Sequence, residues 1–333
     1  MSVMASSPDP RIPVSVVTGF LGAGKTTLVN RVLATAGGRR LAVIVNEFGD
    51  IGLDGELIES EAEDLVELSS GCICCVVRGD LIRTIRGLVQ DRPDIEGILI
   101  ETTGLANPSP VIQTMSVDQL IAARCRLDAV VCVVDALHVT DQLGHSVDAA
   151  DQIALADLLL ITKSTGPTAD IEQQLRCLNP LAPVLRAEGA AISASDILNQ
   201  HRHDPDRVAA SLASAPAPAP DHDHNHSGHI EKTGITSVTL TADAPLDGPA
   251  FETWLRDLLD RFGSDILRTK GILDVAGEDR KLVLQAVNML VEAEFRERWD
   301  TAARQSRLVL IGRRLSRDHL EAGFAGCQAG TVA

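Results

Sequence analysis

The chain has 333 residues, 45% of them hydrophobic and 23% charged, which is enough for two domains with cores of their own. Its 30 basic and 46 acidic residues give a formal charge of −16, so the phosphates of a nucleic acid would be repelled. No apolar run is long enough to span a bilayer, residues 1–10 lack the pattern of a signal peptide, and the seven cysteines are odd in number. We therefore expect a cytoplasmic protein in a reducing compartment, with neither a nucleic acid nor a membrane as partner.

The first element that carries chemistry is a glycine-rich loop between an expected strand, Val14–Thr18, and an expected helix, Thr27–Ala36. The loop, Gly19–Thr26, reads GFLGAGKT and matches the phosphate-binding pattern G-x-x-x-x-G-K-[ST]. Its glycines allow backbone N–H groups to curl around a phosphate, while Lys25 would reach the β- and γ-phosphate oxygens and the Thr26 hydroxyl would hold Mg²⁺. A glycine-rich turn without a ligand is the alternative, but the strand–loop–helix context favours a nucleoside triphosphate site.

From Arg11 to about Ala187, short apolar strands alternate with helical patterns, which is typical of an α/β fold with a mostly parallel sheet covered by helices on both faces. The expected strands are Val14–Thr18, Leu41–Asn46, Gly97–Thr102, Ala129–Asp135, Leu158–Thr162 and Pro183–Arg186. The expected helices include Thr27–Ala36, Asp80–Gln90, Pro108–Met115 and Asp170–Cys177. Ligands of such folds bind beyond the carboxyl ends of the strands, so the informative side chains should follow strands.

Acidic residues follow the second and third of these strands. Glu47 and Asp50, in the segment Asn46–Asp50, could approach Mg²⁺, a second metal or an attacking water, and a solvated polar turn is the alternative. Glu101 stands where P-loop proteins place the acid that supports Mg²⁺ through water, and the N–H group of Gly104 could sense the γ-phosphate. Both segments are therefore candidates for the hydrolytic part of the site.

Three cysteines are crowded into the segment Gly71–Cys75, at Cys72, Cys74 and Cys75. Clustering serves no purpose in core packing, whereas thiolates suit soft or borderline ions such as Zn²⁺, Cu(I) or Co²⁺. Near-adjacent sulfurs rarely all reach one ion with ideal geometry, so we expect a further ligand or an exchangeable site. A redox pair and a purely structural role stay open.

Two further strand ends carry candidate residues. His138 follows the fourth strand and could ligate a metal, although a structural role is the more common one for a lone histidine there. After the fifth strand comes Thr162-Lys163-Ser164-Thr165, where most P-loop GTPases carry [NT]-K-x-D with an Asp that pairs with guanine N1 and N2. Lys163 can still lie over the base, but Thr165 would discriminate guanine more weakly than a carboxylate, so GTP and ATP both stay open. Asp170 resembles a cap for the following helix.

Residues 201–232 have the composition of a linker. Ala213–Pro220 alternates proline with small residues and should be extended rather than helical. Directly after it, four imidazoles lie among two carboxylates within nine residues, at His222, His224, His226 and His229. We interpret this cluster as a loose metal-capturing segment, with a solvated linker as the alternative; its internal position argues against an affinity tag.

The remainder predicts a smaller α+β domain, residues 233–327, followed by a tail, 328–333. Its expected strands are Ser237–Thr241, Ile266–Val275, Lys281–Val287 and Arg307–Ile311, and its expected helices are Gly248–Phe262 and Ser316–Phe324. We find no catalytic constellation there, because Asp274, His319 and Cys327 are isolated in the sequence. The chain thus divides into a disordered start (1–10), a P-loop domain (11–200), the linker (201–232) and this smaller domain.

Taken in this order, the phosphate loop, Asn46–Gly49, Gly71–Cys75 and Glu101–Gly104 resemble the CobW-type family of P-loop GTPases. That family includes zinc metallochaperones and is related to the nickel-insertion GTPases of urease and hydrogenase maturation. The resemblance covers nearly the whole chain, since Ile266–Ile272 and Leu308–Gly312 look like motifs of the family's C-terminal domain. The C-x-C-C segment is its most specific mark.

The resemblance implies a role for each motif. Gly19 through Thr27 would bind the phosphates and Mg²⁺, with Gly19, Gly22, Ala23, Gly24, Lys25, Thr26 and Thr27 as the contributing residues. Glu101 would support Mg²⁺ and hydrolysis, and the segment from Glu47 to Asp50 would be a switch that senses the γ-phosphate. Cys72, Cys74 and Cys75 would form the cargo site, and His138 falls where some members place a further metal ligand. Thr165 departs from the family pattern and puts its GTP preference in question.

The resulting hypothesis is a metallochaperone that hydrolyses GTP, or ATP, with Mg²⁺ and carries Zn²⁺ or Co²⁺. Triphosphate would draw the cysteines into a tight site, and hydrolysis would release the ion to a client docked on the smaller domain. Turnover should be slow, because no arginine finger is visible in the sequence. A nucleotide-regulated zinc-storage or sensing protein and a P-loop small-molecule kinase remain as alternatives, and a homo-oligomer stays open.

Overall fold

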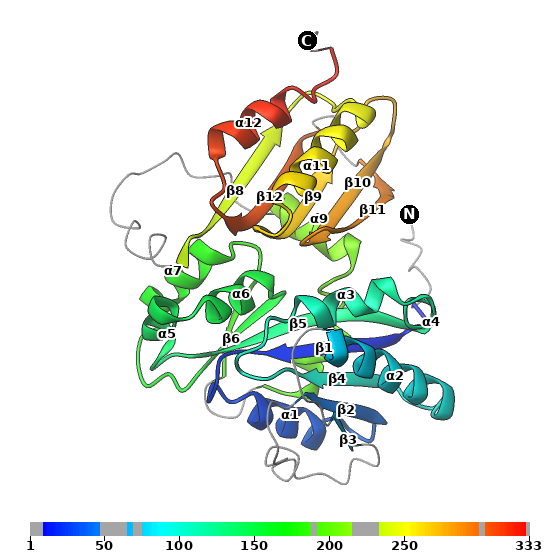
Figure 1. Ribbon diagram of the computed structural model, residues 1–333, viewed down its shortest axis with the longest axis vertical. Coiled ribbons are helices and arrows are strands. Elements are labelled where there is room, and N and C mark those ends of the chain that lie inside the picture. Colours follow the sequence, from blue (N-terminus) through cyan, green and yellow to red (C-terminus); the bar gives the residue numbers. More distant parts are fainter. Residues whose placement is uncertain are drawn as a thin grey trace, which may run out of the picture.

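The computed structural model describes residues 9–46, 65–68, 75–187, 192–214, 233–299 and 304–330. Two sheets dominate it, one in the N-terminal part and one in the C-terminal part, and they lie one above the other along the longest axis (Figure 1). In the part of the chain described, no helix has the length and apolar character needed to cross a bilayer.

The N-terminal sheet has seven strands in the order β3-β2-β4-β1-β5-β6-β7, and each neighbouring pair is parallel. The strands are β1 (Ile12–Thr18), β2 (Leu41–Asn46), β3 (Leu65–Leu68), β4 (Gly97–Glu101), β5 (Cys125–Asp135), β6 (Leu158–Thr162) and β7 (Val184–Arg186). Strand β4 is buried at every residue, as a central parallel strand covered on both faces should be. The α/β class with a parallel sheet is therefore confirmed, and the short strand β3 is an element that the sequence patterns missed.

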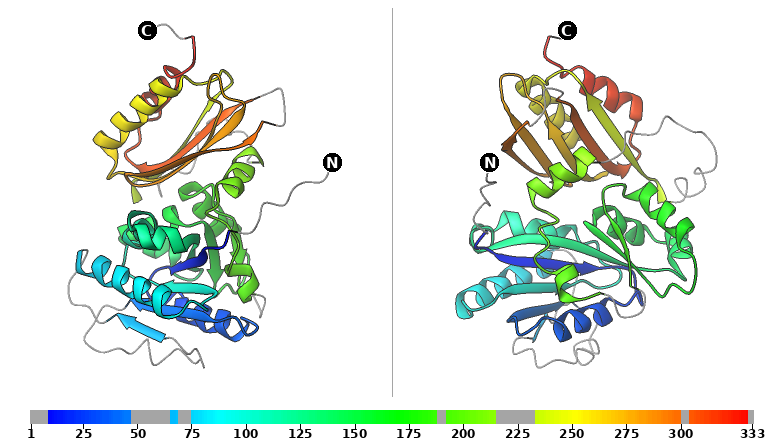
Figure 2. Two further views of the ribbon diagram at one scale, coloured as in Figure 1. Left: turned by 90° about the vertical axis from the view of Figure 1, so that its right-hand side faces the viewer. Right: turned by 180° about the vertical axis from the view of Figure 1, so that it is seen from behind.

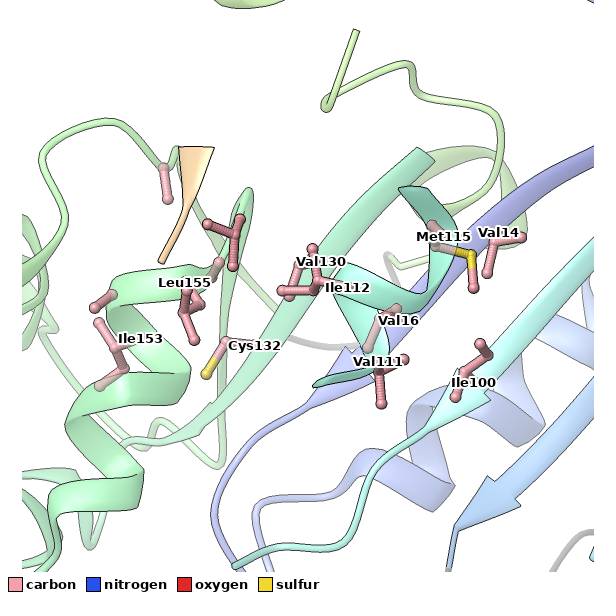
Figure 3. Close-up of a cluster of buried hydrophobic side chains, with 14 of the residues drawn as sticks. Val14, Val16, Ile100, Val111, Ile112, Met115, Val130, Cys132, Ile153 and Leu155 are labelled. Carbon is pink, nitrogen blue, oxygen red and sulfur yellow. The ribbon is translucent and has the colours of Figure 1, made fainter. Parts of the chain in front are cut away.

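Helices cover both faces of this sheet. They are α1 (Lys25–Ala34), α2 (Cys75–Asp91), α3 (Ser109–Val117), α4 (Gln119–Arg124), α5 (Val139–His145), α6 (Val147–Leu155), α7 (Ala169–Leu178) and α8 (Ala194–Ile197). A further helix, α9 (Pro205–Ser214), begins within the predicted linker and packs instead against the C-terminal sheet, so the first part of residues 201–232 is folded rather than extended. Helices α1 and α8 share one hydrophobic cluster with the sheet, whereas α2, α3, α6 and α7 contribute to a second cluster. Figure 3 shows part of the second cluster, where Val111 and Ile112 of α3 lie near the strands and Leu155 lies on α6.

One prediction about a helix cap is wrong, and helix α6 is among those that the sequence patterns missed. Asp170 is not the cap of α7: the N-cap residue is Thr168, and Asp170 lies in the first turn, where its charge suits the helix dipole. Helix α6 was not predicted either, and in it every residue from Ala149 to Leu155 is buried, including the polar Asp151 and Gln152.

The C-terminal sheet has five strands in the order β11-β10-β9-β12-β8, all paired antiparallel. They are β8 (Ile235–Ala242), β9 (Ile266–Leu273), β10 (Arg280–Val287), β11 (Leu290–Arg298) and β12 (Ser306–Arg313). Two helices, α11 (Gly248–Phe262) and α12 (Arg317–Ala325), cover its outer face (Figures 1 and 2). The predicted α+β domain is confirmed, while the edge strand β11 was missed because most of its residues are exposed and many are charged.

The inner face of the C-terminal sheet packs onto the N-terminal part. Residues of β9 divide between the two sides, since Ile266 and Leu273 join the cluster under α11 and α12 whereas Leu267 and Ile272 join the cluster of the N-terminal part. Ile311 of β12 also belongs to that shared cluster. The two parts therefore have one continuous hydrophobic core between them.

A buried group of charges lies at this interface. Asp157, at the start of β6, accepts hydrogen bonds from Arg268 and from Lys270 Nζ (2.9 Å), both on β9, and lies 3.2 Å from His203 Nδ1. The side chains of Asp157 and Arg268 are each only 1% exposed. Burial opposes the negative charge of Asp157, but Arg268 and Lys270 more than offset this and hold its pKa well below the ordinary value. Burial and the nearby Arg268 charge lower the pKa of Lys270 to about 8.

Candidate functional site

The glycine-rich loop joins β1 to α1 in a conformation that depends on glycine. Gly24 is the N-cap of α1 with φ 101°, and no side chain caps the helix there. A Cβ on Gly19 would lie 2.3 Å from the carbonyl oxygen of Val133 on β5, so the loop passes directly against the backbone of the sheet. The first N–H groups of α1 therefore face an anion-binding position of the kind that helix N-termini provide.

The hydroxyl and carboxylate needed for Mg²⁺ lie together beside this loop. Glu101 ends β4, which pairs with β1, and it is 4% exposed. Thr26 Oγ1 donates a hydrogen bond to Glu101 Oε1 at 2.8 Å. Two hard oxygen donors at this distance fit Mg²⁺, which Thr26 would hold directly and Glu101 through water. Lys25 is also buried, with Nζ 3.4 Å from the carbonyl oxygen of Phe20.

The segment after β4 packs tightly on the phosphate loop. A Cβ on Gly104 would lie 2.6 Å from both the backbone N and the Cα of Leu21, so only glycine fits this contact without displacing one of the two loops. Gln152 of α6 holds the segment from the other side, because its Nε2 donates to the carbonyl oxygens of Gly104 and Ala106, each at 3.1 Å. Asn107 Nδ2 in turn donates to Asp151 at 2.9 Å.

The residues at the end of β6 support the phosphate loop from a third direction. Thr162 Oγ1 donates to the carbonyl oxygen of Ala23 at 2.8 Å, and Lys163 Nζ donates to that of Gly22 at 2.6 Å. Lys163 Nζ also contacts Asp135 Oδ2, at the end of β5, at 2.9 Å. Burial opposes ionisation of Asp135, but the bonds from His138 and Lys163 outweigh it and keep its pKa below the ordinary value. The sequence motifs assign no role to Asp135, although its position at the end of a parallel strand is one where ligand-binding residues are expected.

His138 contacts Asp135 rather than a group of metal ligands. Its Nδ1 lies 3.0 Å from Asp135 Oδ2, and its side chain is 63% exposed. Across the described ranges, no group of three or more His, Cys, Asp or Glu side chains could hold a metal ion. The metal role of His138 remains a prediction, with Asp135 as its one ligand neighbour among the described residues.

Several predicted site residues lie outside the described residues. These are Glu47, Asp50, Cys72, Cys74, His222, His224, His226 and His229. Cys75 is the first residue of α2, which follows β3 and the segment between them. The carboxyl end of β3 is on the same edge of the parallel sheet as that of β4, where Glu101 lies.

A cavity of about 590 Å³ lies where a nucleotide base would be expected, next to Lys163. It is lined by Lys163, Ser164, Thr165, Gly166, Pro167, Arg186 and Ala187. None of these lining residues is acidic, and the guanidinium of Arg186 is held by Glu172 of α7, with Nε 2.9 Å from Oε1. The described part of the base site therefore presents hydroxyl groups and cations rather than the carboxylate typical of guanine sites.

A phosphate loop between a parallel strand and a helix, with a carboxylate at the end of the neighbouring strand, defines a P-loop nucleotide-binding protein. The model of the CobW/HypB/UreG nucleotide-binding domain matches residues 13–186, and that of the cobalamin synthesis protein cobW C-terminal domain matches residues 235–328. The chain belongs to the CobW/HypB/UreG family, which confirms the resemblance found in its motifs.

Relatives and solved structures agree with this assignment over almost the full length. The zinc chaperone YjiA of Escherichia coli is 32% identical over 321 residues, which cover 95% of this chain and 98% of that protein. The zinc chaperone CobW of Pseudomonas aeruginosa is 34% identical over 92% of this chain and 89% of its own length. A crystal structure of Zn(II)-bound YjiA GTPase from E. coli superposes with a TM-score of 0.76 at 27% identity, covering 96% of this chain and 99% of that one.

Proposed function

We propose that this protein hydrolyses GTP with Mg²⁺ and uses the nucleotide to control binding of Zn²⁺, or Co²⁺, at the C-x-C-C segment and its delivery to a client protein. The observation that carries the proposal is the pairing of Thr26 with Glu101 beside a helix N-terminus, because it provides the ligands for a Mg²⁺–triphosphate. Membership of the CobW/HypB/UreG family and similarity to two proteins named zinc chaperones support the choice of nucleotide and cargo.

The residues of the phosphate loop would act mainly by position and charge. Backbone N–H groups from Gly22 to Thr27 would surround the β-phosphate, and Lys25 would contact the β- and γ-phosphate oxygens. Mg²⁺, held by Thr26 and Glu101, would neutralise the charge that develops on these phosphates. The Gly104 N–H would detect the γ-phosphate, and Glu47 would orient the attacking water from the switch segment.

The cargo site would be formed by Cys72, Cys74 and Cys75. Its proximity to the nucleotide is supported by topology, because the segment joins the carboxyl end of β3 to α2 at the sheet edge that also carries Glu101. Asp50, His138 and the linker histidines would be auxiliary ligands. In this proposal residues 11–200 carry nucleotide and metal, 201–232 connect, and 233–327 receive the client.

The test is a Zn²⁺ competition titration against a chromophoric chelator, on reduced protein lacking the linker histidines. We expect a non-hydrolysable GTP analogue with Mg²⁺ to tighten Zn²⁺ binding at least tenfold, about 1.4 kcal/mol of coupling. Cys74→Ser should remove this tightening, whereas Cys177→Ser in α7 should keep it and serves as the matched control. Equal Zn²⁺ affinity with and without nucleotide would instead support storage or sensing.

The presence of Thr165 instead of an aspartate allows a separate prediction about which nucleotide base the protein prefers. Because none of the described residues that line the base cavity is acidic, the 2-amino group of guanine should add little affinity, and inosine triphosphate should bind within about threefold of GTP. Thr165→Asp should restore a carboxylate partner and favour GTP over inosine triphosphate by at least tenfold. Fluorescent-nucleotide competition measures both ratios, with Ser164→Asp as a positional control; a wild-type preference for GTP above tenfold would contradict this account.

A further inference from the structure

Helix α6 lies between the segment that follows β4 and the C-terminal sheet. Its residues Ala149–Leu155 are all buried, and two of them are hydrogen-bonded to the C-terminal part of the chain, whose sheet lies above α6 in Figure 1. In the middle of the helix, Asp151 accepts a hydrogen bond from Arg313 at the end of β12. At the end of the helix, the Leu155 carbonyl oxygen accepts one from Arg268 of β9.

Different residues of α6 contact different parts of the N-terminal domain. Asn179 Nδ2 donates to the carbonyl oxygens of Ile153, Ala154 and Ala156 at 2.8, 3.2 and 2.9 Å, so the last turn is fixed to the N-terminal part. In the middle of the helix, Asp151 and Gln152 have side-chain partners in the N-terminal part at residues 104–107. The middle of α6 is therefore the part that motion of this loop would reach.

Asp151 is shared between the loop and the C-terminal domain. One carboxylate oxygen accepts from Asn107 Nδ2 at 2.9 Å and the other accepts from Arg313. The Asp151 side chain is 7% exposed, and burial raises its pKa even though Arg313 opposes this. A carboxylate this buried needs both donors, so displacement of Asn107 changes the environment in which Arg313 is bound.

Gln152 also connects α6 to this loop, through the loop's backbone carbonyl groups. Its single amide nitrogen bridges the carbonyl oxygens of Gly104 and Ala106, which fixes the 104–105 and 106–107 peptide planes. Gly104 lies against the phosphate loop, so a displacement of Gly104 when a γ-phosphate binds would move these carbonyl groups relative to Gln152.

We propose that Asp151 and Gln152 are positioning residues that couple the loop of residues 102–107 to the C-terminal domain through Arg313. This inference rests on the proposed nucleotide function and deepens it, because it names the route by which bound triphosphate alters the surface offered to a client. By linkage, the contact of β12 with α6 then differs between the diphosphate and triphosphate states.

The experiment is hydrogen exchange on the full chain with Mg²⁺ and either GDP or a non-hydrolysable GTP analogue. In the wild type, amides of α6 and β12 should exchange at rates that differ at least fivefold between the two nucleotides. In Arg313→Met the loop after β4 should still respond, whereas β12 should not. Arg313→Lys, which keeps the charge on Asp151, should recover part of the response.

Arg296→Met is the matched control. Arg296 of β11 belongs to the same sheet as Arg313 but pairs with Asp206 of α9 at 3.2 Å rather than with a residue of α6, so its variant should keep the wild-type response. Gln152→Glu tests the other half of the route: the carboxylate would repel the carbonyl oxygens of Gly104 and Ala106 while leaving the Asp151–Arg313 pair intact, and β12 should again become insensitive. Thermal unfolding confirms that each variant is folded.

The inference is overturned if β12 exchanges equally in both nucleotide states of the wild type, or if both Arg313→Met and Gln152→Glu keep the full response. Failure of the proposed function itself looks different. In that case neither nucleotide binds in a fluorescent titration, or the protein binds GTP without hydrolysing it. Both results are obtained without the hydrogen-exchange experiment, so the two kinds of failure can be told apart.

Discussion

Replacing Asp157 by alanine should lower the free energy of unfolding by about 3–5 kcal/mol, which is among the largest effects expected of a single substitution. The change removes the acceptor of Arg268 and Lys270, whose side chains are 1% and 8% exposed, and leaves two buried cations facing each other. Urea unfolding at pH 7 measures the loss. Arg256→Ala removes the exposed pair with Glu252 and should cost no more than about 0.5 kcal/mol.

The pH dependence of this contribution has a definite sign. The pKa of Asp157 is well below 3.8 in the folded chain because Arg268 and Lys270 outweigh the opposing effect of burial. The stabilisation is therefore complete above the unfolded pKa and is lost as the pH falls below 3.8 through the folded value. The difference between wild type and Asp157→Ala should shrink in that acid range; a difference under about 1 kcal/mol at pH 7 would contradict the role assigned to the cluster.

Lys25→Met should reduce kcat/KM for GTP hydrolysis by about 10²–10³, because it removes the cation aimed at the β- and γ-phosphate oxygens while keeping the length of the side chain. The fold should be kept, since the substitution leaves the backbone of the phosphate loop unchanged. Phosphate release gives the rate and fluorescent-nucleotide binding gives the affinity. Hydrolysis within threefold of wild type would rule out this loop as the phosphate site.

Lys281→Met provides the control for that experiment. Lys281 lies on β10, where its Nζ is 5.7 Å from the centre of the Trp299 ring, and it has no contact with the phosphate loop. Hydrolysis by this variant should equal that of the wild type. Parallel loss in both variants would indicate impaired folding rather than loss of a phosphate ligand.

Much of the N-terminal fold and of the phosphate site was predictable from the sequence because both are local. Buried parallel strands such as β4 are continuous apolar runs, and the loop from Gly19 to Thr26 requires its residue types at fixed spacing for backbone reasons alone. The position of Glu101 near the phosphate loop was predictable because the carboxyl ends of parallel strands lie at the same edge of a sheet. The hydrogen bond between Thr26 and Glu101, which are 75 residues apart, agrees with that rule.

Tertiary structure alone decided the roles of the charged residues at the interface. Arg268 and Lys270 lie more than 110 residues from Asp157 in the chain, and nothing local distinguishes them from exposed lysines and arginines. Helix α6 escaped prediction for the same reason, since Asp151 and Gln152 are buried by partners contributed by other segments. Hydrophobic periodicity reports which apolar side chains an element buries, whereas burial of a polar side chain depends on a distant partner that satisfies it.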